Sequence, residues 1–110
     1  MKVLVFGYSD NPERYSNMAY HLLLSFNHEV IKFNPRLDEV KLINYDIETI
    51  TLYVSKPISE KFTRFFLEQN FKRIIFNPGS ENIELEELLL AKGVEVVHGC
   101  TLVMLKTGQF

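Results

Sequence analysis

Short runs of apolar residues alternate along the chain with longer stretches in which apolar residues recur every three or four positions. A short run of apolar or β-branched residues is typical of a strand buried on both faces of a sheet. Spacing of three and four residues is typical of a helix with one buried face. The pattern predicts five strands, at Val3–Phe6, Glu29–Phe33, Thr49–Val54, Arg73–Phe76 and Val94–Val97.

Three helices are predicted between these strands. The first runs from Tyr15 to Phe26, the second begins near Pro57, and the third follows Ser80 and ends at Gly93. Proline fits the first turn of a helix, where its missing N–H costs nothing, and serine is a good N-cap. The expected buried faces are Tyr15, Met18, Ala19, Leu22, Leu23 and Phe26 in the first helix, Ile58, Phe62, Phe65 and Phe66 in the second, and Leu85, Leu88 and Leu89 in the third.

Strands that alternate with helices through short connections are typical of βαβ units, which place parallel strands in one sheet. We therefore expect an α/β fold, a parallel sheet with helices on both faces. Residues 36–48 mix charged residues with scattered Leu, Val and Ile at no sustained period. This segment is interpreted as a loop that holds at most a short strand or turn.

Residues that break secondary structure directly follow each predicted strand. Because the strands are expected to be parallel, these breakers gather at the carboxyl edge of the sheet, where open α/β sheets bind their ligands. The breakers are Gly7, Asn34-Pro35, Ser55-Lys56-Pro57, Asn77-Pro78-Gly79 and His98-Gly99-Cys100. We expect the functional site at this edge.

The segment 2–16 combines a buried strand, a tight turn that begins at Gly7 and a helix start. The free backbone N–H groups and positive dipole end of a helix start can hold a phosphate. The dinucleotide fingerprint G-x-G-x-x-G would need glycine also at Ser9 and Pro12, which disfavours NAD. Arg36 follows the second strand where an NAD site would carry an acidic residue, so a 3′-phospho-ADP group or NADP fits better. The alternative is that Gly7 and Ser9 only make a tight turn.

Several single residues at this edge have both a ligand-binding and a structural interpretation. Arg14 and Ser16 lie at the first helix start and can reach the same phosphate, or serve as solvated surface and cap. Lys56 has the same two interpretations. Tyr53 fits the core better than the ligand site, and Cys100 fits a buried structural thiol better than a reactive one.

Composition and charge narrow the function further. The chain has 110 residues, 46% of them hydrophobic and 24% charged, which is typical of one globular domain spanning residues 1–110. A net charge of -2 and a pI near 5.9 disfavour nucleic-acid binding. The apolar runs are far shorter than the roughly 20 residues that span a bilayer. A single cysteine and no secretory leader pattern favour a cytoplasmic protein.

Motifs for metal binding and catalysis are missing from the sequence. The three histidines have no metal-ligand spacing, and one cysteine cannot complete a structural zinc site. No nucleophile elbow and no glycine-rich loop followed by lysine are found. We therefore expect neither a metal nor catalytic residues.

Four segments resemble the small CoA-binding domain proteins, which are similar to the CoA-binding region of succinyl-CoA synthetase. The segments are VFGYSDNPERYSNMAYHLL at residues 5–23, Asn34-Pro35-Arg36, TLYVSKP at residues 51–57 and IIFNPGSENIELEELLLAKGVEVVHGCTLVML at residues 74–105. The resemblance covers nearly the whole chain. It implies a three-layer, Rossmann-like open sheet of five parallel strands in the order 3-2-1-4-5, with coenzyme A at the carboxyl edge.

The resemblance also implies roles for individual residues. Gly7, Tyr8 and Ser9 would contact the pyrophosphate of CoA, supported by Arg14 and Ser16. The adenosine and its 3′-phosphate would be flanked by Asn34, Pro35 and Arg36, with Lys56 and Pro57 on the adenine side. The pantetheine arm and its thiol would lie near Asn77, Pro78, Gly79 and Cys100. Residues 37–48 look shorter than the corresponding segment of many members.

The leading hypothesis is a non-catalytic or regulatory protein that binds CoA or an acyl-CoA. One alternative is a small enzyme that uses NADP or an acyl-CoA, and another is an interaction scaffold that keeps the nucleotide-binding fold without a ligand. The expected partner is a small nucleotide, not nucleic acid or a membrane, and the sequence leaves a homodimer open.

Overall fold

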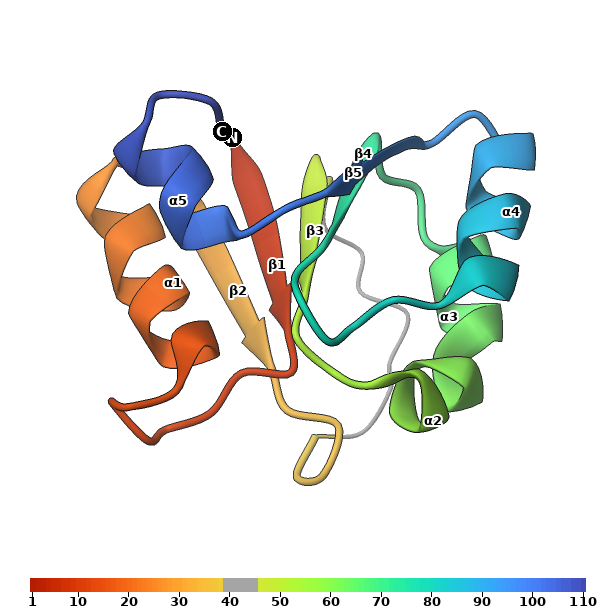
Figure 1. Ribbon diagram of the computed structural model, residues 1–110, viewed down its shortest axis with the longest axis horizontal. Coiled ribbons are helices and arrows are strands. Elements are labelled where there is room, and N and C mark those ends of the chain that lie inside the picture. The colour runs from red at the N-terminus through yellow and green to blue at the C-terminus, as the bar shows by residue number, and fades with distance from the viewer. Residues whose placement is uncertain (39–45) are drawn as a thin grey trace.

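The five predicted strands form one parallel sheet. The structure is a computed structural model that describes residues 1–38 and 46–110. The order across the sheet is β2-β1-β3-β4-β5, and each neighbouring pair is parallel (Figure 1). The strands are β1 (Lys2–Phe6), β2 (Glu29–Phe33), β3 (Thr49–Leu52), β4 (Arg73–Phe76) and β5 (Glu95–His98).

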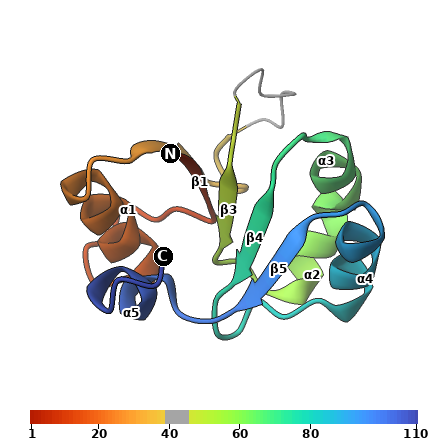
Figure 2. The same ribbon diagram turned by 90° about the horizontal axis from the view of Figure 1, so that it is seen from above.

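Helices cover both faces of the sheet, which confirms the predicted three-layer α/β architecture. Figures 1 and 2 show α1 and α5 on one face and α2, α3 and α4 on the other. The helices of the first face are α1 (Tyr15–Ser25) and α5 (Thr101–Lys106). Those of the second face are α2 (Lys56–Ser59), the 3₁₀ helix η1 (Glu60–Phe62), α3 (Thr63–Glu68) and α4 (Ile83–Ala91).

The expected strand order, 3-2-1-4-5, is wrong, because the centre of the sheet is β3 and not β1. All four residues of β3 are buried, as a strand with neighbours on both sides and helices on both faces requires. In β2, by contrast, Glu29 and Lys32 are exposed. Charged side chains suit an edge strand, so the composition of these two strands agrees with the observed order.

The core lies in two parts, one on each face of the sheet. On the α2–α4 face, the ring of Phe6 contacts those of Phe33, Phe62, Phe65 and Phe66 at centroid distances between 4.9 and 5.8 Å. The smaller cluster on the α1–α5 face contains Val3, Val5, Leu23 and Leu105, with Tyr8, Tyr20 and Tyr53 packed against it. The alternation of β1 residues between the two clusters follows from the pleat of a strand.

Parts of the predicted helices differ from the structure. In α1, Ala19 and Leu23 are buried, but Tyr15, Met18 and Phe26 are exposed. The helix packs through a narrower stripe than predicted, because α5 covers only part of it. In α4, Leu88 is likewise exposed at 45% of its surface.

Two helix boundaries also need correction. The N-cap of α4 is Asn82, whose side-chain oxygen accepts a hydrogen bond from Leu85 N at 3.1 Å, whereas Ser80 lies earlier in the turn. The predicted second helix is divided into α2, η1 and α3, with a φ of -111° at Phe62. The short helix α5 was not predicted, since six residues give too little periodicity to distinguish helix from strand.

Within residues 1–38 and 46–110, no helix has the length and apolar character needed to cross a membrane. Part of the segment expected to form a loop, residues 39–45, lies outside the described residues.

Candidate functional site

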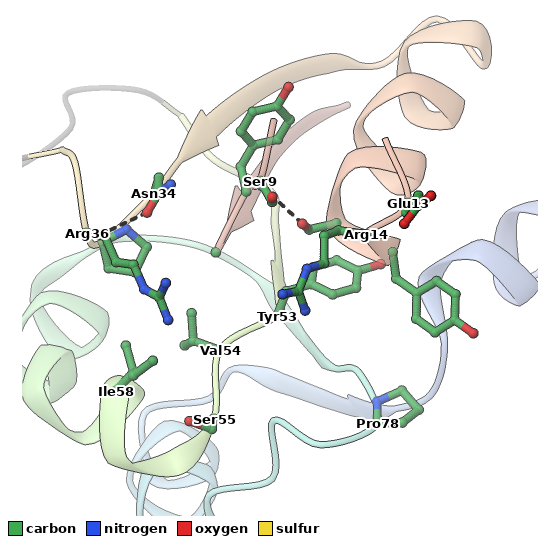
Figure 3. Close-up of a pocket in the computed structure, with 15 residues that line it drawn as sticks. Ser9, Glu13, Arg14, Asn34, Arg36, Tyr53, Val54, Ser55, Ile58 and Pro78 are labelled. Atoms are coloured by element: carbon green, nitrogen blue, oxygen red, sulfur yellow. Dashed lines mark hydrogen bonds between the residues drawn. The ribbon is translucent and has the colours of Figure 1, made fainter. Parts of the chain in front are cut away.

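A cavity of about 530 Å³ lies at the carboxyl edge of the sheet, where ligand binding was expected. Its walls come from the segments that follow β1, β2, β3 and β4, together with the start of α1 (Figure 3). This volume is in the range of known ligand pockets. The lining residues are Gly7, Tyr8, Ser9, Glu13, Arg14, Tyr15, Ser16, Asn34, Pro35, Arg36, Tyr53, Val54, Ser55, Ile58 and Pro78.

Most of the predicted site residues meet at this cavity. Those that line it are Gly7, Tyr8, Ser9, Arg14, Ser16, Asn34, Pro35, Arg36 and Pro78. Those that lie outside the lining are Lys56, Pro57, Asn77, Gly79 and Cys100. The β1–α1 loop and the turn after β2, which are distant in sequence, therefore share one pocket.

The amides of the β1–α1 loop do not form a free phosphate-binding nest. Gly7 N and Tyr8 N both donate to the carbonyl oxygen of Phe33, at 2.8 and 2.9 Å. Ser9 N donates to Ser16 Oγ at 3.1 Å. These bonds fasten the loop to the end of β2 and to α1. The loop thereby forms one wall of the cavity, and the amides of Gly7, Tyr8 and Ser9 already have acceptors.

Gly7 allows two segments to approach closely. Its φ is +102°, in the left-handed region that favours glycine. A Cβ atom at this position would lie 2.8 Å from Val54 Cγ1 and 3.1 Å from the carbonyl carbon of Tyr53. Glycine therefore brings the β1–α1 loop against the segment that follows β3.

The start of α1 offers the donors that the loop lacks. Arg14 is the N-cap and its side chain makes no cap hydrogen bond. Among the described residues, the amides of Tyr15 and Ser16 have no acceptor. Unpartnered amides at the N-terminus of a helix, with the positive end of its dipole, favour an anion. Because these amides and Arg14 line the same cavity, an anion is best placed at the start of the helix.

Arg36 is presented by a compact turn after β2. Asn34 Oδ1 accepts from Arg36 N at 2.9 Å, and Asn34 N donates to Asp38 Oδ2 at 2.7 Å. Figure 3 shows Arg36 and Arg14 reaching into the cavity from opposite sides. Neither guanidinium has an ion pair with a described residue. Two unpaired cations facing one cavity favour a ligand with more than one anionic group.

Sequence reasoning missed the apolar side of the cavity. Val54 and Ile58 lie beside Arg36 in Figure 3, and Pro35 and Pro78 add further apolar surface. A signal was available, since Val54 and Ser55 directly follow a buried strand at the carboxyl edge. Tyr53 also lines the cavity, and it packs against the core cluster of the α1–α5 face as the sequence favoured.

Three predicted residues are engaged elsewhere. The ammonium group of Lys56 pairs with the Glu84 carboxylate at 3.0 Å, which ties α2 to α4. Pro57 is exposed in the first turn of α2. Gly79 N donates to Glu81 Oε1 at 3.1 Å. Hydrogen bonds from the amides of Glu81 and Gly79 lower the pKa of the Glu81 carboxyl group. These two backbone donors therefore have their acceptor within the same turn.

Asn77 is a structural hub and does not line the cavity. It is 2% exposed, and its Nδ2 donates to Thr51 Oγ1 at 2.8 Å and to Leu52 O at 2.9 Å. Its Oδ1 accepts from Thr101 N at 2.9 Å, which fixes the start of α5 against β3 and β4. Cys100, the N-cap of α5, has a free and partly exposed thiol outside the lining.

A comparison with protein-family models decides what kind of domain this is. The model described as CoA binding domain matches residues 1–106. The chain belongs to the CoA-binding domain family. The resemblance found in the sequence is therefore confirmed, and the family's ligand contains the anionic groups that the two arginines favour.

Solved structures share the fold of this chain. A crystal structure of an uncharacterized protein is 37% identical, with a TM-score of 0.91, and the match covers 99% of this chain and 97% of that one. A hypothetical protein from Pyrococcus horikoshii OT3 is 23% identical with a TM-score of 0.85, covering 96% and 81% of the two chains. A conserved hypothetical protein from Pyrococcus furiosus is 29% identical with a TM-score of 0.73, covering 88% and 91%. None of the curated proteins matches this CoA-binding domain.

Proposed function

We propose that this protein binds coenzyme A or an acyl-CoA in the cavity at the carboxyl edge of the sheet. The observation that carries the proposal is the donor set of that cavity. Arg14, Arg36, Tyr15 and Ser16 line one pocket in a chain of the CoA-binding domain family. Among the described residues, the two guanidinium groups have no ion pair and the amides of Tyr15 and Ser16 have no acceptor.

The start of α1 would hold the diphosphate. Arg14 supplies a planar guanidinium that suits a phosphate oxygen pair, and the amides of Tyr15 and Ser16 add donors. The role expected for Ser16 changes accordingly. Its hydroxyl accepts from Ser9 N, so its side chain positions the loop while its amide faces the anion.

Arg36 would hold the 3′-phosphate on the β2 side of the cavity, and Val54, Ile58 and Pro35 would supply apolar surface for the adenosine. The pantetheine arm would then run past Tyr53 toward Pro78, along the ends of β3 and β4. In this arrangement the phosphate groups lie beside cationic side chains, and the adenosine lies against apolar side chains.

A binding role without catalysis is the form of the proposal that the lining supports. The cavity presents serine and tyrosine hydroxyls and the carboxylate of Glu13 but, among the described residues, neither an imidazole nor a thiol. No hydrogen bond joins the Glu13 carboxylate to a hydroxyl of the lining among the described residues. A hydroxyl nucleophile needs an adjacent general base to become reactive. We therefore propose that CoA is held, not turned over.

Thermal unfolding with a panel of ligands tests this function. CoA at about 100 times its Kd should stabilise the protein by about 2.7 kcal/mol. Each kcal/mol raises the Tm of a domain of this size by roughly 4–8 °C. CoA should raise Tm most, dephospho-CoA less, and NAD least, with NADP and acetyl-CoA included in the panel.

Two arginine variants separate the phosphate sites. Arg36→Gln should weaken CoA binding by about 10- to 100-fold and abolish the preference for CoA over dephospho-CoA. Arg14→Gln should lower the affinity for CoA and the affinity for dephospho-CoA by the same factor. Arg64→Gln, an exposed arginine on α3, is the matched control and should leave both affinities unchanged. If CoA does not raise the Tm of the wild type, or if NADP raises it more than CoA does, the proposal is overturned.

A further inference from the structure

Tyr53 lines the cavity, but its hydroxyl group is buried in the protein and not exposed to the cavity. The residue as a whole is partly exposed. Among the described residues this hydroxyl has no hydrogen-bond partner. A tyrosine at a surface usually does the reverse, burying the ring and keeping the hydroxyl in water or paired.

The polar groups nearest the Tyr53 hydroxyl are already engaged with one another. Thr51 Oγ1 and Thr101 Oγ1 lie 2.7 Å apart, and Asn77 Nδ2 donates to Thr51 Oγ1. The two threonine hydroxyls lie close enough to lower the pKa of Tyr53 by hydrogen bonding to its ionised form, but the neutral Tyr53 hydroxyl makes no hydrogen bond of good geometry with either of them. The Tyr53 hydroxyl therefore adjoins a polar network without joining it.

A buried hydroxyl without a partner destabilises the state in which it occurs, because it has lost its bonds to water. Burial also raises the pKa of Tyr53 to about 12, against the opposing effect of Thr101 and Thr51, so the hydroxyl is neutral at physiological pH. A neutral hydroxyl is a donor available for a carbonyl or phosphate oxygen.

The main chain at Tyr53 is fixed, so the side chain is the part that can move. Tyr53 N donates to Phe6 O at 2.9 Å, which continues the pairing of β3 with β1. The ring borders a cavity of about 530 Å³, which gives room for rotation about the side-chain bonds. Rotation of the Tyr53 side chain toward the cavity would move the hydroxyl away from the buried position in which it has no hydrogen-bond partner.

We propose that Tyr53 contributes to ligand affinity by turning into the cavity and donating a hydrogen bond to an amide carbonyl of the pantetheine arm. This inference rests on the proposed function, because it assigns a partner within the same ligand. The arm is the part concerned, since Tyr53 follows β3 and lies between Arg14 and Pro78 in Figure 3, away from Arg36. Arg36 would contact the nucleotide end of the ligand, and Tyr53 would contact its pantetheine arm.

Tyr53→Phe tests this role, because it removes only the hydroxyl. Unfolding of the ligand-free variant should occur at the same Tm or a higher one, since no hydrogen bond is lost. Its affinity for CoA, measured by titration calorimetry, should fall by about three- to tenfold. Its preference for CoA over dephospho-CoA should stay unchanged, because the two ligands share the same arm.

Tyr20→Phe is the matched control. Tyr20 lies outside the cavity, and its ring contacts Tyr8, His21 and Lys32. The Tyr20 variant should keep the CoA affinity of the wild type.

Two results would overturn the role of Tyr53 alone. One is wild-type binding of CoA with an unchanged affinity in Tyr53→Phe. The other is a lower Tm of the ligand-free variant, which would mean that an internal water already satisfies the hydroxyl. If the wild type does not bind CoA at all, the proposed function fails and this inference fails with it.

Discussion

Gly7 combines a backbone conformation and a close contact that only glycine allows. Any side chain at φ +102° is strained, and a Cβ would lie 2.8 Å from Val54 Cγ1. We expect Gly7→Ala to lower the free energy of unfolding by more than about 2 kcal/mol, because conformational strain and overpacking add. Urea unfolding followed by circular dichroism measures this cost.

Gly79→Ala separates the two contributions. Gly79 has a similar φ of +91°, but no atom of the described residues lies within 4 Å of the position its Cβ would take. Its substitution should therefore cost only the conformational strain, about 1 kcal/mol. Equal losses of stability in the two variants would show that the contact between Gly7 and Val54 is not tight.

The stability of the protein should depend on Tyr53 at high pH. Burial raises the pKa of Tyr53 to about 12, from an ordinary value of 10.0. A group whose pKa is raised on folding stabilises the folded state fully below its unfolded pKa, and this contribution is lost as pH rises through the folded pKa. Between pH 10 and 12 the wild type should therefore lose roughly 2–3 kcal/mol more than Tyr53→Phe.

Urea unfolding of the wild type and Tyr53→Phe at pH 9, 10 and 11 should show about half of that difference at pH 11, which lies midway between the unfolded and folded pKa. The other titrating groups are common to both proteins. Parallel pH profiles would mean that the Tyr53 hydroxyl reaches water when the protein is folded.

At the scale of elements, Asn77 joins β3, β4 and α5 through three side-chain hydrogen bonds. Asn77→Ala leaves the buried amide of Thr101 without its acceptor, and it removes one of the two hydrogen bonds that Thr51 Oγ1 and Leu52 O each make. We expect a loss of about 2–4 kcal/mol in the free energy of unfolding, measured in urea. Ser80→Ala removes the bond from Ser80 Oγ to Asn77 O and should cost about 1 kcal/mol. Similar costs for both variants would contradict the assignment of Asn77 as the hub.

The elements that the sequence predicted well are those with a strong local pattern. All five strands were predicted, and the start of α1 at Tyr15 was placed correctly. The strand order was not, because a hydrophobic pattern records whether a strand is buried and not which strand lies beside it. The exposed Glu29 and Lys32 of β2, and the uniformly apolar or β-branched β3, were the available signals.

For the molecule as a whole, the sequence predicted the location of the cavity better than its chemistry. Breakers after parallel strands must meet at one edge, so Gly7, Asn34 and Pro78 were expected together and line one cavity. The hydrogen bonds of those breakers depend on contacts between distant segments. Asn77 and Gly79 therefore proved to be satisfied by the protein itself, which no spacing rule could indicate.

The position of β2 at the margin of the sheet has a consequence for how a ligand would act on the fold. This strand is held by a single ladder, to β1, and the turn that carries Arg36 extends from its end. Arg14 and Tyr53 belong to segments on the far side of that ladder. A nucleotide that contacts all three residues would link the edge strand β2 to the buried strands across that ladder. With the nucleotide bound, β2 and the buried strands would then unfold together and not separately.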